Sequence, residues 1–177
     1  MRRLIQMVAL ALACLLPVAA ASAADLENTL YLDLKDGRVV IEMYPEQAPK
    51  HVARIKELAR AGFYDGLVFH RVIDGFMAQT GDPKGTGAGG SGQKLPAEFN
   101  TIKHLRGTVS MARTSDPNSA DSQFFICFQP SSFLDGKYTA WGRVIEGMQY
   151  VDAIKRGEPP ADPDKILKLQ VAADVQG

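Results

Sequence analysis

Between residues 67 and 145 the chain divides into short apolar runs separated by glycine and proline, and this pattern restricts the fold more than any other feature. Each run has the length of a strand, and the runs are rich in β-branched and aromatic residues. They do not alternate with helical stretches, as the strands of a parallel α/β sheet would. The runs lie at 67–73, 76–80, 107–113, 123–128 and 138–145. An antiparallel sheet is therefore expected.

The segments on either side of this region add further strands. Residues 29–34 alternate apolar and polar side chains, and residues 39–43 repeat the alternation after an intervening Asp36-Gly37. Asp-Gly between two alternating runs is typical of a tight hairpin. Residues 164–173 have the composition of a last strand.

Only two stretches have helical spacing. Residues 48–61 place Val52, Ile55 and Leu58 on one stripe, and residues 147–156 repeat this pattern before Gly157. Two helices cannot cover both faces of a large open sheet. We therefore predict a mainly β fold, in which an antiparallel sheet closes into a barrel and a helix covers each open end.

The first 24 residues have the pattern of a secretory signal peptide. Residues 1–3 are basic at positions 2 and 3, residues 4–20 carry no charge, and residues 21–24 supply small side chains for cleavage after Ala23 or Ala24. A retained membrane anchor is the alternative, because the apolar run is nearly long enough to span a bilayer. We expect cleavage, a mature domain over residues 25–177, and a location in the periplasm or outside the cell.

Charge and size restrict the partners of the mature domain. Removing 24 residues leaves 153, with 18 basic and 20 acidic side chains, so the net charge is about −2. The mature domain has no block of basic residues, and neither nucleic acid nor membrane is expected as a partner. A domain of about 150 residues buries enough surface to fold without disulfides, and we expect a monomer. The remaining cysteine, Cys127, lies in an apolar run and is read as a buried small side chain, with a reactive thiol as the alternative.

Several familiar catalytic patterns are absent or incomplete. Residues 85–90 match G-x-G-x-x-G, but residues 91–96 cannot begin the helix that a dinucleotide site requires, so the glycines predict a loop that a ligand chain can approach. Ser110 and His70 could belong to a serine-hydrolase triad, but no G-x-S-x-G turn supports this. The three histidines lack metal-ligand spacing. No metal or cofactor is expected.

The segment 67–82, LVFHRVIDGFMAQTGD, sets one cation, Arg71, and one amide, Gln79, among apolar side chains. A surface strand would carry charges on alternate positions, and a buried strand would carry none. Arg71 is either a buried arginine neutralised by a distant carboxylate or a functional cation in an apolar site.

Four blocks in the chain resemble the cyclophilins, which are peptidyl-prolyl cis–trans isomerases. The blocks are residues 69–82, 107–112, 121–126 and 133–138, in the family's order, and the resemblance extends over about residues 28–172. It implies an eight-stranded antiparallel barrel capped by two helices. It also implies catalysed rotation about Xaa-Pro bonds in folding or exported polypeptides, without a cofactor.

The resemblance gives Arg71 a chemical role. Rotation about a peptide bond crosses a barrier of about 18–20 kcal/mol because twisting removes amide resonance. The proline nitrogen then gains a lone pair that a fixed guanidinium can stabilise, and a partner that favours the twisted amide lowers the barrier. By resemblance Arg71 is that guanidinium, and Gln79 orients it and reaches the substrate backbone.

The remaining site residues also follow from the resemblance. The proline ring would lie against Phe76, Met77, Phe125 and Leu134, with Phe133 and Tyr138 at the rim. The peptide would be held by the main chain near Ala112 and Arg113 and by the side chain of Gln123. Thr86, Gly87 and Ala88 would border the pocket for residues before the proline.

Two positions of the implied site depart from the commonest family pattern. Many members have tryptophan where this chain has Phe133, and histidine where it has Tyr138. The tryptophan position affects cyclosporin affinity, so weak cyclosporin binding is expected. Two other functions remain open: a module that binds proline segments without turnover, and a holdase chaperone, which would need a broad exposed apolar patch.

Overall fold

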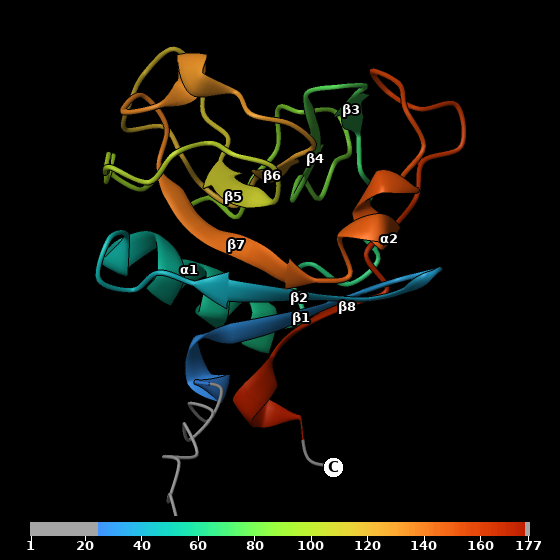
Figure 1. The fold of residues 1–177 in the computed structure, drawn as a ribbon, viewed down its shortest axis with the longest axis horizontal. Helices are drawn as coiled ribbons and strands as arrows, with labels where there is room; N and C mark the ends of the chain where they lie inside the picture. Colours follow the sequence, from blue (N-terminus) through green and yellow to red (C-terminus); the bar gives the residue numbers. More distant parts are fainter. Residues whose placement is uncertain (1–24, 176–177) are drawn as a thin grey trace, which may run out of the picture.

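A computed structural model describes residues 25–175, and its main element is an eight-stranded sheet (Figure 1). All neighbouring strands are antiparallel, and their order is β3-β4-β6-β5-β7-β2-β1-β8. The strands are β1 (Thr29–Leu34), β2 (Gly37–Met43), β3 (Arg71–Ile73), β4 (Met77–Thr80), β5 (Thr108–Met111), β6 (Phe124–Cys127), β7 (Ala140–Glu146) and β8 (Lys168–Val171). Each lies within or beside a predicted run, so the mainly β antiparallel fold is confirmed.

The sheet is curled, and its edge strands β3 and β8 are not paired with each other. The segments that precede them join the two edges instead. The Gly66 N–H donates to the Ile166 carbonyl at 2.8 Å, Ile166 donates to Leu67 at 2.9 Å, and Phe69 donates to Asp164 at 2.9 Å. The eight strands therefore form a curled half-barrel, whose edges are joined by irregular backbone hydrogen bonds and not by a regular strand pair.

Two helices lie on opposite sides of the sheet, α1 to the left and α2 to the right in Figure 1. Helix α1 (Pro49–Arg60) buries the predicted apolar stripe. Helix α2 (Met148–Asp152) is shorter than the predicted 147–156. After it the chain turns so that Gly157 pairs with Val72 beside β3, which removes the last predicted residues from the helix. The short 3₁₀ helices are η1 (Leu26–Asn28), η2 (Ser132–Leu134) and η3 (Ala172–Asp174).

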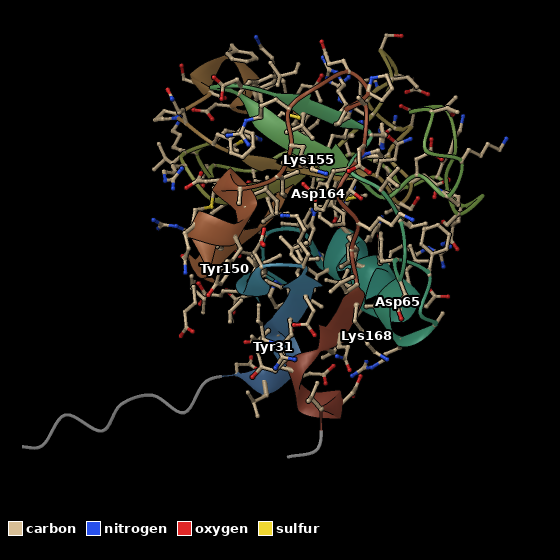
Figure 2. All side chains as sticks on the ribbon, turned by 90° about the vertical axis from the view of Figure 1, so that its right-hand side faces the viewer. Tyr31, Asp65, Tyr150, Lys155, Asp164 and Lys168 are labelled. Carbon is tan, nitrogen blue, oxygen red and sulfur yellow. The ribbon has the colours of Figure 1, made fainter. Side chains whose placement is uncertain are left out.

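The hairpin between β1 and β2 is confirmed, but its two-residue turn lies one position before the expected Asp36-Gly37, and β2 begins at residue 37 where residue 39 was expected. Leu34 faces Gly37 in the ladder, so Lys35 and Asp36 form the turn and Gly37 begins β2. The ring of Tyr150, which Figure 2 labels next to β2, occupies the space of a Gly37 side chain, since a Cβ there would lie 2.4 Å from the ring. Glycine is therefore required by packing at this position.

Strands β4 and β6 separate two apolar clusters. Ala78, Phe124 and Ile126 point into the barrel and belong to its large core. Met77 and Phe125 point to the other face, where they form a small second cluster with Cys127 and Leu134. Alternate residues of the same strands thus serve two different environments.

Two predictions concern the ends of the chain and its cysteine. The predicted signal peptide falls on residues 1–24, which are outside the described residues. Within residues 25–175 no helix is long and apolar enough to cross a membrane. Cys127 is buried, and burial raises the pKa of its thiol to about 12. The interpretation of Cys127 as a buried small side chain is confirmed.

Candidate active site

A cavity of about 760 Å³ opens on the outer face of β4 and β6. Its size is in the usual range for ligand pockets. Its walls come from β3, β4, β6, η2, the segment after α2 and the loop of residues 85–90, called the glycine loop below. The lining residues are His70, Arg71, Phe76, Met77, Gln79, Gly85, Thr86, Gly87, Ala112, Arg113, Phe125, Phe133, Leu134, Tyr138, Glu158 and Pro159.

The structure places twelve of the fourteen predicted site residues around this one cavity. The other two, Ala88 and Gln123, line a smaller adjoining hollow. Gln79 and Gly87 belong to both walls. Residues from four separate sequence blocks therefore meet at one place, although their roles in binding and catalysis stay predictions.

The cavity floor is apolar and closely packed. The Phe125 ring is 4% exposed, and the Tyr138 ring packs edge-on against it at a centroid distance of 6.0 Å. At the rim the rings of Phe76 and Phe133 lie 5.4 Å apart. Met77 and Leu134 complete the floor. Such a surface suits a compact apolar ring, because the ring would bury apolar area against it.

Arg71 lies at the edge of this floor, as the first residue of β3. Its side chain is 45% exposed, so it is not a buried arginine. It does have a carboxylate partner, since its Nε donates to Oε1 of Glu158 at 2.7 Å. Within residues 25–175 its two terminal nitrogens donate no hydrogen bond, and they remain available to a ligand.

Arg113 is the other arginine of the cavity wall, and its guanidinium is already engaged. Its terminal nitrogens donate to the carbonyls of Lys137 at 2.7 Å and Thr114 at 2.8 Å. Its Cζ also lies 4.3 Å above the Tyr138 ring. Of these two arginines, only Arg71 keeps its terminal N–H donors free. Its guanidinium is oriented by one hydrogen bond, which is made at Nε.

The expected contact between Gln79 and Arg71 is not made, although the two residues face each other across the β3–β4 ladder. The Gln79 Nε2 donates to Oε1 of Gln123 at 2.9 Å instead. Gln123 in turn donates to the carbonyls of Gly87 at 2.9 Å and Gly89 at 2.7 Å. The two amides thus fasten the glycine loop to the sheet, and Glu158 holds Arg71.

Asp82 fixes the other side of the glycine loop. Its carboxylate accepts backbone hydrogen bonds from Lys84 at 2.7 Å, Thr86 at 2.9 Å and Gly87 at 2.6 Å. Burial acts to raise the pKa of Asp82, but these backbone donors outweigh it and lower the pKa to about 2. The loop is confirmed as an ordered wall with no helix after it.

His70 is a wall residue that was not among the predicted site residues. It is 5% exposed, and neither ring nitrogen has a hydrogen-bond partner among the described residues. Burial lowers the pKa of His70, which favours the neutral ring. In the sequence, only its position directly before Arg71 indicated that His70 could line the site. Glu158 and Pro159 gave no signal at all, because they are distant in sequence.

The structure does align a serine, a histidine and an aspartate, but not around His70. The Ser110 Oγ lies 3.0 Å from Nε2 of His104, and Nδ1 of His104 lies 3.1 Å from Oδ1 of Asp135. Ser110 is completely buried, so no substrate can reach its hydroxyl. The His104 ring stacks against Phe125 at 6.2 Å, so this line of residues supports the cavity floor.

Metal binding has no evident location in the described part of the chain. Among residues 25–175, no group of three or more His, Cys, Asp and Glu side chains lies close enough together to hold an ion.

The sequence matches one protein family over most of its length. The model of the family described as "Cyclophilin type peptidyl-prolyl cis-trans isomerase/CLD" matches residues 29–171. A probable peptidyl-prolyl cis-trans isomerase of Brucella suis is 52% identical over 176 residues, covering 90% of each chain. A peptidyl-prolyl cis-trans isomerase of Synechococcus elongatus is 42% identical over 145 residues, covering 81% of this chain and 95% of its own.

Solved structures agree with the sequence matches. Cyclophilin AquaCyp293 from Hirschia baltica superimposes with a TM-score of 0.80 at 32% identity, covering 86% of this chain and 76% of its own. A Cryptosporidium parvum cyclophilin-type isomerase, crystallised in the presence of the dipeptide Ala-Pro, has a TM-score of 0.75 at 30% identity, covering 81% and 98%. The chain belongs to the cyclophilin-type peptidyl-prolyl cis–trans isomerases.

Proposed function

We propose that this isomerase accelerates rotation about Xaa-Pro bonds by electrostatic stabilisation of the twisted amide, with Arg71 as the catalytic cation. The planar amide nitrogen has no free lone pair, and the twisted nitrogen has one. A guanidinium beside the nitrogen therefore favours the transition state over both ground states. An interaction that is stronger in the transition state is the kind that raises kcat.

The observation that carries this proposal is the state of the Arg71 guanidinium. It lies at the edge of an apolar floor, is anchored at Nε, and keeps its terminal nitrogens free. A preformed donor needs little reorganisation when charge develops next to it. The other arginine of the wall, Arg113, has its terminal nitrogens engaged by backbone carbonyls.

The apolar floor supports the second part of the mechanism, in which the proline ring anchors the peptide. Phe125, Met77 and Leu134 form a surface that fits a compact apolar ring. With the ring held there, the peptide segment before the proline can rotate over Arg71. The adjoining hollow by Ala88 and Gln123 would receive residues that precede the proline.

Substitution of Arg71 tests the mechanism. We expect Arg71→Ala to lower kcat/KM for a short Xaa-Pro peptide by about 100-fold or more, as removal of a preorganised transition-state donor does. Arg71→Lys should recover only part of the activity, because lysine keeps the charge but lacks the planar guanidinium. The matched control is Arg143→Ala, an exposed arginine of β7 outside the cavity wall.

A binding module without turnover is the second candidate. It predicts that the wild type binds proline peptides and does not accelerate their isomerisation. It also predicts no kinetic difference between the wild type and Arg71→Ala. Measured acceleration that depends on Arg71 would exclude this candidate.

We further propose that the protein is exported and acts on folding polypeptides in the periplasm or outside the cell. The support is the basic, apolar and small-residue pattern of residues 1–24. Expression of the full chain in a bacterial host, followed by N-terminal sequencing of the secreted or periplasmic form, should give a first residue at Ala24 or Asp25. A full-length chain retained in the membrane would favour the anchor.

A further inference from the structure

Among residues 25–175, Glu158 is the single carboxylate in the cavity wall, and it comes from a part of the chain distant from the signature blocks. It lies 87 positions after Arg71 and contacts it through Oε1 at 2.7 Å. Its side chain is 52% exposed, so burial does not hold it in place. Its position must therefore be set by the segment that carries it.

That segment, residues 155–164, is fastened at both ends. Gly157 exchanges two backbone hydrogen bonds of 2.8 Å with Val72, the neighbour of Arg71 in β3. At the base of the segment the Lys155 N–H donates to the Asp164 carboxylate at 2.9 Å, and Figure 2 shows these two residues side by side. The Lys155 ammonium also pairs with Asp162, but both side chains are largely exposed, so this pair adds little to the fastening.

Gly157 also lets the segment fold back on itself. It has a φ of +147°, and a Cβ there would lie 2.6 Å from Cα of Pro160. The residue after this tight bend is Glu158. Gly157 is therefore bound to β3 by two backbone hydrogen bonds and makes a bend that only glycine fits. Glu158, the next residue, is held beside the strand that carries Arg71.

The contact with Glu158 is made through Nε of Arg71 and not through either of the two terminal guanidinium nitrogens. An arginine has five N–H donors in a fixed plane. A hydrogen bond at Nε fixes that plane and leaves the four terminal donors free. A bidentate pair through the terminal nitrogens would instead occupy the donors that a substrate needs.

We propose that Glu158 is a positioning residue for Arg71: it holds the guanidinium through Nε in the orientation that catalysis requires. This inference rests on the proposed role of Arg71. It replaces the expected support from Gln79, whose amide is engaged with Gln123. The Glu158 carboxylate also offsets part of the positive charge of Arg71. The orientation that Glu158 provides should therefore raise the rate, whereas its negative charge should lower it.

Two variants of Glu158 separate these effects. Glu158→Ala removes both the acceptor and the charge, and we expect kcat/KM to fall by about two- to fivefold, the range that an exposed ion pair supports. The loss should be in kcat, because the proline floor is unchanged. Glu158→Gln keeps an acceptor oxygen at the same reach and should restore most of the lost rate.

Two other carboxylates provide matched controls. Asp162→Ala removes a charge from the same segment, and Asp74→Ala breaks a pair with Nε of Arg156 at 3.1 Å that lies outside the cavity wall. Neither should alter kcat. A fall in kcat with Asp162→Ala equal to that with Glu158→Ala would show a general charge effect and would overturn the proposal.

The Nε–Hε resonance of Arg71 gives a readout that does not depend on activity. In ¹⁵N-labelled wild type it should be a resolved, exchange-protected signal, identified by its loss in Arg71→Lys. It should persist in Glu158→Gln and collapse toward the free-arginine position in Glu158→Ala. An unchanged signal in Glu158→Ala, or a faster enzyme, would overturn the positioning role. A wild-type rate unaffected by Arg71→Ala would instead refute the catalytic role of Arg71.

Discussion

The two faces of β4 and β6 have similar residues and different tasks. Phe124 and Ile126 point into the barrel, where both are fully buried in the large core. Phe125 and Met77 point outward and form the floor of the cavity. The inner side chains are enclosed by the whole sheet, whereas the outer ones are covered by loops and η2.

This difference shows how one short strand can serve stability and function at once. A strand sends alternate residues to opposite faces, so substitution on one face need not disturb the other. We expect changes on the inner face to alter mainly the free energy of unfolding. Changes on the outer face should alter mainly binding and turnover.

The largest expected effect on stability comes from the inner face. Phe124→Ala should lower the free energy of unfolding by about 3–5 kcal/mol, because it leaves a cavity in a closed core. Urea denaturation measures this change. The control is Phe133→Ala at the cavity rim, where the side chain is 61% exposed and a change within about 0.5 kcal/mol is expected. Equal losses at the two positions would contradict the comparison.

A smaller effect is expected in the glycine loop that walls the cavity. The pKa of Asp82 is about 2 in the folded protein, below its ordinary value of 3.8. At a pH above this ordinary pKa, the ionised carboxylate therefore stabilises the fold. This contribution disappears as the pH falls through about 2. Asp82→Asn should lower the free energy of unfolding at pH 7 by about 2 kcal/mol.

Unfolding measured between pH 7 and pH 2 checks the sign of this prediction. The difference between the wild type and Asp82→Asn should be constant above about pH 5 and shrink as the pH falls from about 4 to 2. A difference that stays constant to pH 2 would show that the charge of Asp82 does not contribute.

Substitution of Phe133 at the cavity rim should change the affinity for cyclosporin without changing the fold. Phe133→Trp adds an indole N–H donor to an exposed position beside the proline floor. We expect cyclosporin to bind about tenfold more tightly, the effect of about one added hydrogen bond. Isothermal titration of both proteins measures it. Unchanged affinity would show that the bound drug places no acceptor near this position.

The smallest expected effect concerns Cys127, which lies under the cavity floor. Its thiol is buried, and its pKa is raised to about 12, so a thiol reagent at pH 8 should not label the folded protein. Labelling should appear with the unfolding transition in urea. Rapid labelling in the absence of denaturant would show that the outer cluster opens more readily than the comparison implies.

The fold could be predicted because its elements are local patterns. The alternation in β1 and β2 and the glycine and proline breaks after residue 67 located all eight strands. The way the sheet edges meet could not be predicted, since it depends on irregular hydrogen bonds between residues 66–69 and 164–166. Such contacts leave no period in the sequence.

The site was predictable where it lies in contiguous blocks and not elsewhere. Arg71 was singled out because a lone cation among apolar residues is unusual. Its partner Glu158 lies in a polar, proline-rich segment with no pattern of its own, and the pairing arises only when Gly157 joins β3. The Gln79–Arg71 contact was expected from the resemblance alone; the two residues do face each other across the β3–β4 ladder, but the Gln79 amide makes its hydrogen bond to Gln123.

The central claim is that the outer face performs the chemistry through Arg71. The most direct test is the cis–trans exchange rate of a saturating Xaa-Pro peptide, measured by NMR on the wild type and on Arg71→Ala, with the free energy of unfolding of both proteins. We predict that exchange on Arg71→Ala falls by about 100-fold while peptide binding and stability are retained. Exchange at the wild-type rate on a folded, peptide-bound Arg71→Ala would contradict the account.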